Sequence, residues 1–283
     1  MSITIKEALQ RASFLLQTAG LEQPRREAQI LLTAIINQPL AWLYAHDQES
    51  LSVAEWERYQ EWLTRRAQGE PFAYLVGEKE FMGLSFTVTP QVLIPRPETE
   101  FLVEVTVDLL REIKNPRILE VGVGSGAVAI SLAVLLPEAQ VTAVDYSAEA
   151  LAVANSNATR HGVAKRIRLL QGDLYTPVRG ESFDAVVSNP PYIPAAEIAQ
   201  LQRDVKDFEP HLALDGGADG LDFYRRLTGE LHTLSTIPKL LAFEVGDNQA
   251  DAVTGLCQSA GYKNTRQILD LAGISRIIVG QLS

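Results

Sequence analysis

Apolar residues at helical spacing dominate the first part of the chain. A capping box of Thr4 and Glu7 opens a run whose apolar members share one helical face: Ile5, Leu9, Ala12, Leu16 and Ala19. Pro24 suits the first position of a second helix, and Ser52 with Glu55 forms the capping box of a third. Residues 1–70 are therefore predicted to form a small helical domain, without catalytic residues, that serves recognition or docking.

The pattern changes between residues 71 and 96. Apolar residues there gather on both sides of Gly83 and are followed by Pro90, which is typical of a short β-hairpin. Pro97 then favours the start of a helix that runs through Leu110. We expect residues 71–96 to be a β-hairpin connector between two domains.

From residue 117 onward, apolar strand-like runs alternate with helical stretches. The strand candidates are residues 117–121, 140–145, 166–171, 183–188, 239–244, 264–270 and 274–279. This alternation predicts a mostly parallel sheet with helices on both faces, so residues 97–283 are expected to form one α/β domain. The long irregular segment 193–220 is predicted to be functional, because loops of that length are uncommon as simple connections.

Composition narrows the classes of protein. The chain has 283 residues and a net charge of −10, which argues against a broad nucleic-acid surface but leaves a local basic patch open. Cys257 is the only cysteine and the four histidines are scattered, so no structural metal is expected. No apolar run is long enough to cross a bilayer, and the first residues lack a signal-peptide pattern. We expect a cytoplasmic monomer with no membrane partner.

A glycine-rich turn after the first strand of the α/β domain marks a candidate cofactor site. The acid Glu120 precedes a run of small residues that leads into a helix: Gly122, Val123, Gly124, Ser125 and Gly126. Glycines let the backbone approach a ligand closely, and a helix N-terminus offers free N–H groups. The glycines run G-x-G-x-G, whereas dinucleotide dehydrogenases favour G-x-G-x-x-G. This spacing favours S-adenosylmethionine, which has an amino-acid end and no pyrophosphate.

Two further acids follow later strands. Asp145 ends the strand after the glycine turn, where a carboxylate can accept hydrogen bonds from both hydroxyls of a ribose. Asp173 follows the third strand and is predicted to meet the adenine amino group while Leu174 packs on the ring. Each acid taken singly could be a solvated loop residue or a helix cap. As an ordered set with Glu120 and Asn189, they predict a cofactor site.

A stiff loop after the fourth strand predicts the chemistry. Asn189, Pro190, Pro191 and Tyr192 are expected at a strand's C-terminal end, where open α/β sheets bind ligands. Pro190 holds Asn189 in an extended conformation, and neither proline has an N–H to donate. The loop can therefore direct the Asn189 side chain and the Pro190 carbonyl at one point beside an aromatic ring. A planar –NH2 group fits this cradle, and a proline-rich turn with a core tyrosine is the structural alternative.

Together these motifs resemble class I S-adenosylmethionine-dependent methyltransferases that act on nitrogen. Within that class the chain is similar to the release-factor glutamine methyltransferase family (HemK/PrmC). Three stretches carry the closer match: residues 71–81 with Pro-Phe-Ala-Tyr, residues 93–100 with Pro-Arg-Pro-Glu-Thr-Glu, and residues 209–221 with Glu-Pro and Asp-Gly-Leu. Glu120 stands where many relatives carry aspartate, and the longer side chain is still expected to reach the methionine end.

The resemblance implies a substrate and a role for each residue. The substrate would be the glutamine of the Gly-Gly-Gln motif in class-1 peptide chain release factors, methylated on its side-chain nitrogen N5. Asn189 and the Pro190 carbonyl would accept its two N–H bonds, and Tyr192 would stack on the amide plane. Pro191 would complete the substrate contact, and the Rossmann-like domain would bind S-adenosylmethionine.

Other readings remain open at this stage. N-P-P-Y also suits a methyltransferase of adenine in nucleic acids, although residues 1–85 contain eight Lys or Arg against eleven Asp or Glu. A ribosomal-protein glutamine methyltransferase would share the fold and motif. A binding module that has lost turnover and a nicotinamide-dependent oxidoreductase fit the motifs less well.

Overall fold

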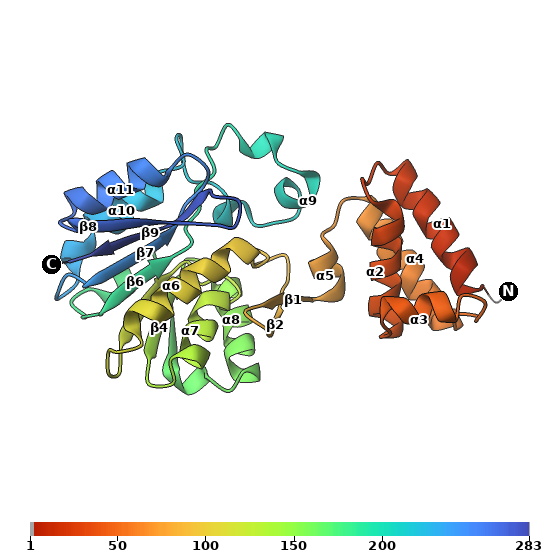
Figure 1. Cartoon of the computed structure of the whole chain (residues 1–283), viewed down its shortest axis with the longest axis horizontal. Coiled ribbons are helices and arrows are strands. Elements are labelled where there is room, and N and C mark those ends of the chain that lie inside the picture. The colour runs from red at the N-terminus through yellow and green to blue at the C-terminus, as the bar shows by residue number, and fades with distance from the viewer. Residues whose placement is uncertain (1–2, 283) are drawn as a thin grey trace. The chain divides into compact units, whose positions relative to one another are not determined.

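The computed structural model describes residues 3–282. The chain divides into two compact units (Figure 1). Unit 1 holds the residues up to Gly77 together with Gln202–Phe208. Unit 2 holds Glu78–Leu201 and the residues from Glu209 onward. The chain therefore leaves unit 2 at Leu201, adds a short segment to unit 1, and returns at Glu209.

Unit 1 is helical. Its helices are α1 (Ile5–Thr18), α2 (Pro24–Ile36), α3 (Leu40–Ala45), α4 (Val53–Ala67), α5 (Phe72–Val76) and the short α9 (Arg203–Lys206). Both predicted capping boxes are formed, with Thr4 and Glu7 at α1 and with Ser52 and Glu55 at α4. Pro24 is the first residue of α2, as predicted.

The core of unit 1 uses most of the positions that the helical spacing predicted, although Ala19, the C-cap of α1, is exposed and Ala8 is buried instead. Leu16, Leu31 and Leu32 are fully buried, and Tyr59 of α4 is buried with them. The Tyr59 hydroxyl donates a hydrogen bond to the Ala28 carbonyl at 2.7 Å, which satisfies its polar atom inside the core. The helices are therefore held together by an apolar centre with one satisfied polar contact.

Unit 2 begins with a hairpin. Strands β1 (Glu78–Phe81) and β2 (Leu84–Thr87) pair antiparallel, with Phe81 opposite Leu84. The two residues between them, Met82 and Gly83, have φ of 53° and 71°, as a tight two-residue turn requires. The predicted connector thus contains a helix, α5, as well as a hairpin.

A seven-stranded sheet forms the centre of unit 2. Its strands are β3 (Arg117–Val121), β4 (Gln140–Asp145), β5 (Ile167–Gln171), β6 (Ala185–Ser188), β7 (Leu240–Glu244), β8 (Asn264–Leu269) and β9 (Ser275–Gln281). The order is β5-β4-β3-β6-β7-β9-β8, and only the pairs that involve β9 are antiparallel. The predicted α/β fold with a mostly parallel sheet is confirmed.

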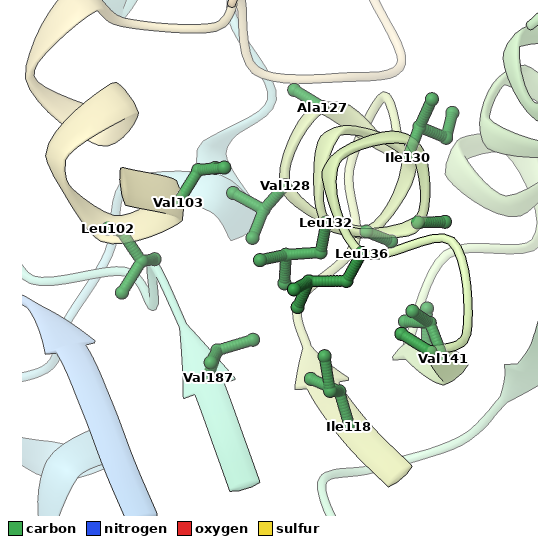
Figure 2. Packing of buried hydrophobic residues seen from close by; sticks show 14 of the residues in the cluster. Leu102, Val103, Ile118, Ala127, Val128, Ile130, Leu132, Leu136, Val141 and Val187 are labelled. Atoms are coloured by element: carbon green, nitrogen blue, oxygen red, sulfur yellow. The ribbon is translucent and has the colours of Figure 1, made fainter. Parts of the chain in front are cut away.

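Helices cover both faces of this sheet (Figure 1). One face carries α6 (Glu100–Leu110), α7 (Ala127–Leu135) and α8 (Ala148–Arg160), and the other carries α10 (Asp222–Gly229) and α11 (Ala250–Ser259). Neighbouring strand residues point to opposite faces, so Ile118 packs under α7 while Leu119 belongs to the other cluster. Figure 2 shows Leu132 of α7 on the side of the helix that faces Ile118 of β3 and Val187 of β6 in this core.

The strand order places a switch point at β3. The chain runs from β3 to β4 on one side and later places β6 on the other side. In such a sheet, the loops at the carboxyl ends of the two central strands diverge and leave a crevice. This crevice is where the candidate residues lie.

Candidate active site

A cavity of about 370 Å³ opens at the carboxyl ends of the parallel strands of unit 2. Most of the predicted site residues line it: Glu120, Gly122, Val123, Gly124, Ser125, Asp145, Asp173, Leu174, Asn189, Pro190 and Pro191. Of the predicted residues within the described part of the chain, Gly126 and Tyr192 lie outside the lining. Four different strands therefore bring residues that are far apart in sequence into one site.

The glycine turn needs glycine for two reasons. Gly122, Gly124 and Gly126 all have positive φ, between 52° and 85°, where a side chain is strained. A Cβ atom on Gly126 would also lie 2.8 Å from Ile130 Cδ1 and 3.2 Å from Ala154 Cβ, so these side chains would have to shift. Gly126 thus packs against α7 and α8, and the other two glycines line the cavity.

A buried asparagine supports the turn from α8. The Asn157 side chain donates to the Ser125 carbonyl at 2.9 Å and to the Thr87 carbonyl at 3.0 Å. Its oxygen accepts from the Thr87 N–H at 2.9 Å. The end of the hairpin is therefore tied to the glycine turn. Asn157 could not be predicted from the sequence, because nothing local marks an asparagine inside a helix as a tertiary bridge.

Two carboxyl groups face the cavity from β3 and β4. Glu120 is buried, which raises its pKa well above the ordinary value, and the Ala129 N–H opposes this shift by hydrogen bonding. Its Oε2 atom has no hydrogen-bond partner within residues 3–282. Burial also raises the pKa of Asp145, whose two oxygens accept the N–H groups of Gly124 and Ser147, each at 2.9 Å. Glu120 therefore offers an unsatisfied acceptor to a cationic or donor group in the cavity.

Asp173 is held by a residue that the sequence analysis did not single out. Arg226 of α10 donates to both Asp173 oxygens, at 3.0 and 2.8 Å, and both residues line the cavity. This pairing raises the pKa of the guanidinium further. Leu174 follows with φ of 47° and is buried. The two partners are 53 positions apart, so no local pattern could have linked them.

The Asn-Pro-Pro-Tyr loop begins where β6 ends. The Ser188 hydroxyl donates to the Val121 carbonyl at 2.7 Å, which ties the end of β6 to the end of β3. Asn189 Nδ2 donates to Thr99 Oγ1 at 3.1 Å. Because the nitrogen is bonded to Thr99, the side-chain oxygen Oδ1 is the atom that can accept a hydrogen bond from a ligand.

Tyr192 takes a different position from its neighbours. Its ring packs against Gly246, where an added Cβ would lie 2.8 Å from the ring, and its carbonyl accepts from Gln249 at 2.8 Å. Burial raises the pKa of its hydroxyl to about 12. The ring is thus part of the loop's packing.

An ion pair with one buried partner closes another side of the cavity. Arg96, which lines the cavity, pairs with Glu209, and the Glu209 carboxylate also accepts the Ile94 N–H at 3.2 Å. The Glu209 side chain is only 2% exposed. The segments 93–100 and 209–214, which the resemblance singled out, therefore meet at the site.

Among residues 3–282, no group of histidine, cysteine or acidic side chains could hold a metal ion. Within the same range, no helix is both long and apolar enough to cross a membrane.

Comparisons with known proteins identify the class of fold. The catalytic domain of hMettl16, solved in complex with a MAT2A 3′UTR hairpin, covers 83% of this chain and 85% of its own length with a TM-score of 0.58 and 13% identity. The match to a methyltransferase from Pyrococcus furiosus covers 80% of this chain and 98% of that protein, with a TM-score of 0.51 and 19% identity. The models of the PrmC N-terminal domain and the Methyltransferase small domain match residues 7–77 and 98–216. The fold is that of a class I methyltransferase.

Closer relatives define the family. A release factor glutamine methyltransferase of Moorella thermoacetica is 45% identical over 97% of both chains. One of Geobacter sulfurreducens is 40% identical over 99% of this chain and 97% of its own. The chain belongs to the release factor glutamine methyltransferase family, as the resemblance predicted.

Proposed function

We propose that this protein transfers a methyl group from S-adenosylmethionine to the side-chain nitrogen N5 of the glutamine in the Gly-Gly-Gln motif of class-1 peptide chain release factors. The observation that carries the proposal is the Asn189–Thr99 hydrogen bond at the edge of the cavity. It supports an Asn189 side chain that presents its oxygen to a substrate –NH2 group. The names of the relatives support release factors over nucleic-acid or ribosomal-protein substrates.

The loop would make a poor nucleophile reactive. An amide nitrogen is weakly nucleophilic because its lone pair is delocalised into the carbonyl. Asn189 Oδ1 and the Pro190 carbonyl would accept its two N–H bonds, which orients the nitrogen and stabilises the positive charge that develops on it. Alignment of this kind can lower a barrier by several kcal/mol, up to roughly 7–11 in the best cases. The nitrogen gains the methyl group and then loses a proton to water, so no strong base is required.

We assign Tyr192 and Pro191 to the substrate side of the loop. Tyr192 is partly exposed and lies outside the cavity lining, within the described residues. Its packing against Gly246 fixes the course of the chain after Pro191. The ring would then meet the glutamine amide from the outer side, while the cavity remains for the methyl donor.

The cavity has groups that fit S-adenosylmethionine. When bound, this cofactor supplies an activated methyl group on a sulfonium. The unpartnered Glu120 oxygen would accept from its ammonium group, and Asp145 would accept from its ribose hydroxyls. The adenine would be contacted by Leu174 and by Asp173, which is paired with Arg226. In the turn from Gly122 to Gly126, the lack of side chains would let the backbone lie close to the ligand.

We assign distinct tasks to the parts of the chain. The helical residues 1–70 would grip the release factor, residues 71–96 would connect, and residues 97–283 would bind the cofactor and carry the reaction. The match of residues 7–77 to the PrmC N-terminal domain supports a separate first domain. Since release factors act in translation, we assign the reaction to the cytoplasm. We propose that the protein acts as a monomer.

Mass spectrometry tests this proposal. The purified protein is incubated with S-adenosylmethionine and a class-1 release factor, and the expected product carries one added CH2 unit on the Gly-Gly-Gln glutamine. The matched control is the same factor with that glutamine replaced by alanine, which should stay unmodified. Methylation of a ribosomal protein or of DNA in parallel reactions, with none of the release factor, would overturn the proposal.

A further inference from the structure

A buried carboxyl group lies behind the Asn189 loop and takes no part in the reaction described above. Glu244 ends strand β7, next to β6, and only 2% of the residue is exposed. Its Oε2 atom finds no hydrogen-bond partner in the part of the chain that the structure describes. Glu244 is absent from the cavity lining among these residues.

Thr99 connects this carboxyl group to Asn189. Thr99 is buried, and its Oγ1 accepts the Asn189 Nδ2 hydrogen at 3.1 Å. The same hydroxyl acts on Glu244, whose pKa it lowers against the effect of burial. A hydroxyl has one hydrogen to donate. If that hydrogen points at Glu244, only the oxygen lone pairs face Asn189, and these can bind the amide –NH2 but not the amide oxygen.

We propose that Thr99 and Glu244 are positioning residues that set the orientation of the Asn189 amide, so that Oδ1 and not Nδ2 faces the methyl acceptor. This inference rests on the proposed function for its catalytic consequence. The Asn189–Thr99 hydrogen bond and the place of Glu244 on the strand next to β6 do not depend on that function. A flipped amide would present donors to a substrate –NH2 that itself needs acceptors, and the cradle would fail.

The protonation of Glu244 should control this orientation. Burial raises the pKa of Glu244 to about 7, and the Thr99 hydrogen bond and the Arg276 and Arg96 charges oppose the shift, while Glu98 adds to it. The charge of this carboxyl group also raises the pKa values of Tyr192 and Tyr224, and the Tyr224 hydroxyl donates to the Glu244 backbone carbonyl at 2.7 Å. A protonated Glu244 can donate to Thr99, which frees the Thr99 hydrogen to bind Asn189 Oδ1 and stabilises the wrong orientation.

Two series of variants test the relay in the full-length protein. Thr99→Val removes the hydroxyl at nearly constant volume and should lower kcat about 10- to 100-fold, the range typical of residues that orient a functional group. Thr99→Ser keeps the hydroxyl and should restore most of the rate. A purely structural role would not separate valine from serine in this way at equal thermal stability.

The pH profile supplies a second readout. The wild-type kcat should fall as the pH drops below about 7, the pKa of Glu244. Glu244→Gln always carries a donor, so its kcat should be low and should not show this acid limb. A wild-type rate in Thr99→Val at saturating substrates, or the same acid limb in Glu244→Gln, would overturn the proposal.

A measurement without turnover separates the relay from the proposed function. The side-chain –NH2 signals of Asn189, assigned by NMR through their loss in Asn189→Ala, should exchange slowly with water in the wild type and fast in Thr99→Val. Absence of methylation by the wild type would count against the proposed function only, whereas equal exchange in both proteins would overturn the relay.

Discussion

Three acidic residues in or beside the cavity have buried carboxyl groups. Burial raises the pKa values of Glu120, Asp145 and Glu244 above their ordinary values. Their surroundings then divide them. Asp145 is satisfied by backbone N–H groups, whereas Glu120 and Glu244 each keep one oxygen without a partner within residues 3–282. Buried, unsatisfied carboxyl groups reduce stability, so their presence here indicates a task in binding or positioning.

Replacement of Asn189 tests the residue at the centre of the site. Asn189→Ala should reduce methyl transfer by about 10²- to 10³-fold, the usual effect of removing one preorganised group that stabilises developing charge. Affinity for S-adenosylmethionine should change little, because the glycine turn, Glu120 and Asp145 remain. Calorimetric titration and a methylation assay measure the two effects. An equal loss of affinity and turnover would contradict the assignment.

Glu244 also predicts how stability depends on pH. The pKa of Glu244 is raised from 4.5 to about 7 in the folded protein, so the folded state binds the proton more tightly than the unfolded state. Stability is then fully present at low pH and is lost as the pH rises through this range. The free energy of unfolding of Glu244→Gln, relative to that of the wild type, should therefore rise by on the order of 3 kcal/mol between about pH 5 and about pH 8.

Urea unfolding at the two pH values measures this difference. The exposed Glu104, on α6, offers a matched control in Glu104→Gln, which reports the effect of the substitution alone. If the unfolding free energies of Glu244→Gln and the wild type change equally with pH, burial does not raise the pKa of Glu244.

At the scale of elements, α7 carries both the cofactor turn and the core. Its first residues follow the glycine turn, and seven of its residues are buried against the sheet and its neighbouring helices. The helix is apolar on nearly all sides because α6 and α8 flank it. Movement of α7 would therefore shift the turn that faces the cavity, so core packing and cofactor binding depend on one element.

Leu132 tests this dependence. Leu132→Ala should reduce the free energy of unfolding by about 2–5 kcal/mol, because the side chain is fully buried in the core that Figure 2 shows. The control on the same helix is Leu135→Ala, since Leu135 is 45% exposed and should change stability by less than about 0.5 kcal/mol. Similar losses for both variants in urea unfolding would show that α7 is not packed as described.

At the scale of the whole molecule, the segment 193–220 contributes residues to both units. Residues 202–208 are part of unit 1, while Pro210, Leu212 and Ala213, just after them, line the cavity of unit 2. The loop predicted to be functional, 193–220, is therefore covalently continuous with both the proposed recognition domain and the site.

Substrate size tests the recognition role of unit 1. If unit 1 grips the release factor, a short Gly-Gly-Gln peptide should have a much higher KM than the whole factor, with a smaller change in kcat. Phe14 of α1 is 72% exposed and offers a probe. Phe14→Ser should raise KM for the whole factor and leave the peptide kinetics unchanged. An effect on both substrates would indicate loss of folding instead of loss of recognition.

The sequence by itself determined the elements and the motifs. Apolar spacing predicted the helices of unit 1 and the strands of the sheet, because burial of one face or of a whole strand leaves a local period. The glycine turn, Asp145 and Asn189 were predicted because each stands at the end of a strand. α3 and α5 were missed, since they are only six and five residues long and leave no clear period.

Only the tertiary structure decided which side chains meet. Arg226 with Asp173, Asn157 with the glycine turn, and Glu244 with Thr99 join residues from separate elements. The position of Tyr192 against Gly246 was decided in the same way. A motif records the residues that touch a ligand within one stretch of chain. The partners that orient them come from any strand or helix that the fold brings near, and spacing along the chain holds no record of those contacts.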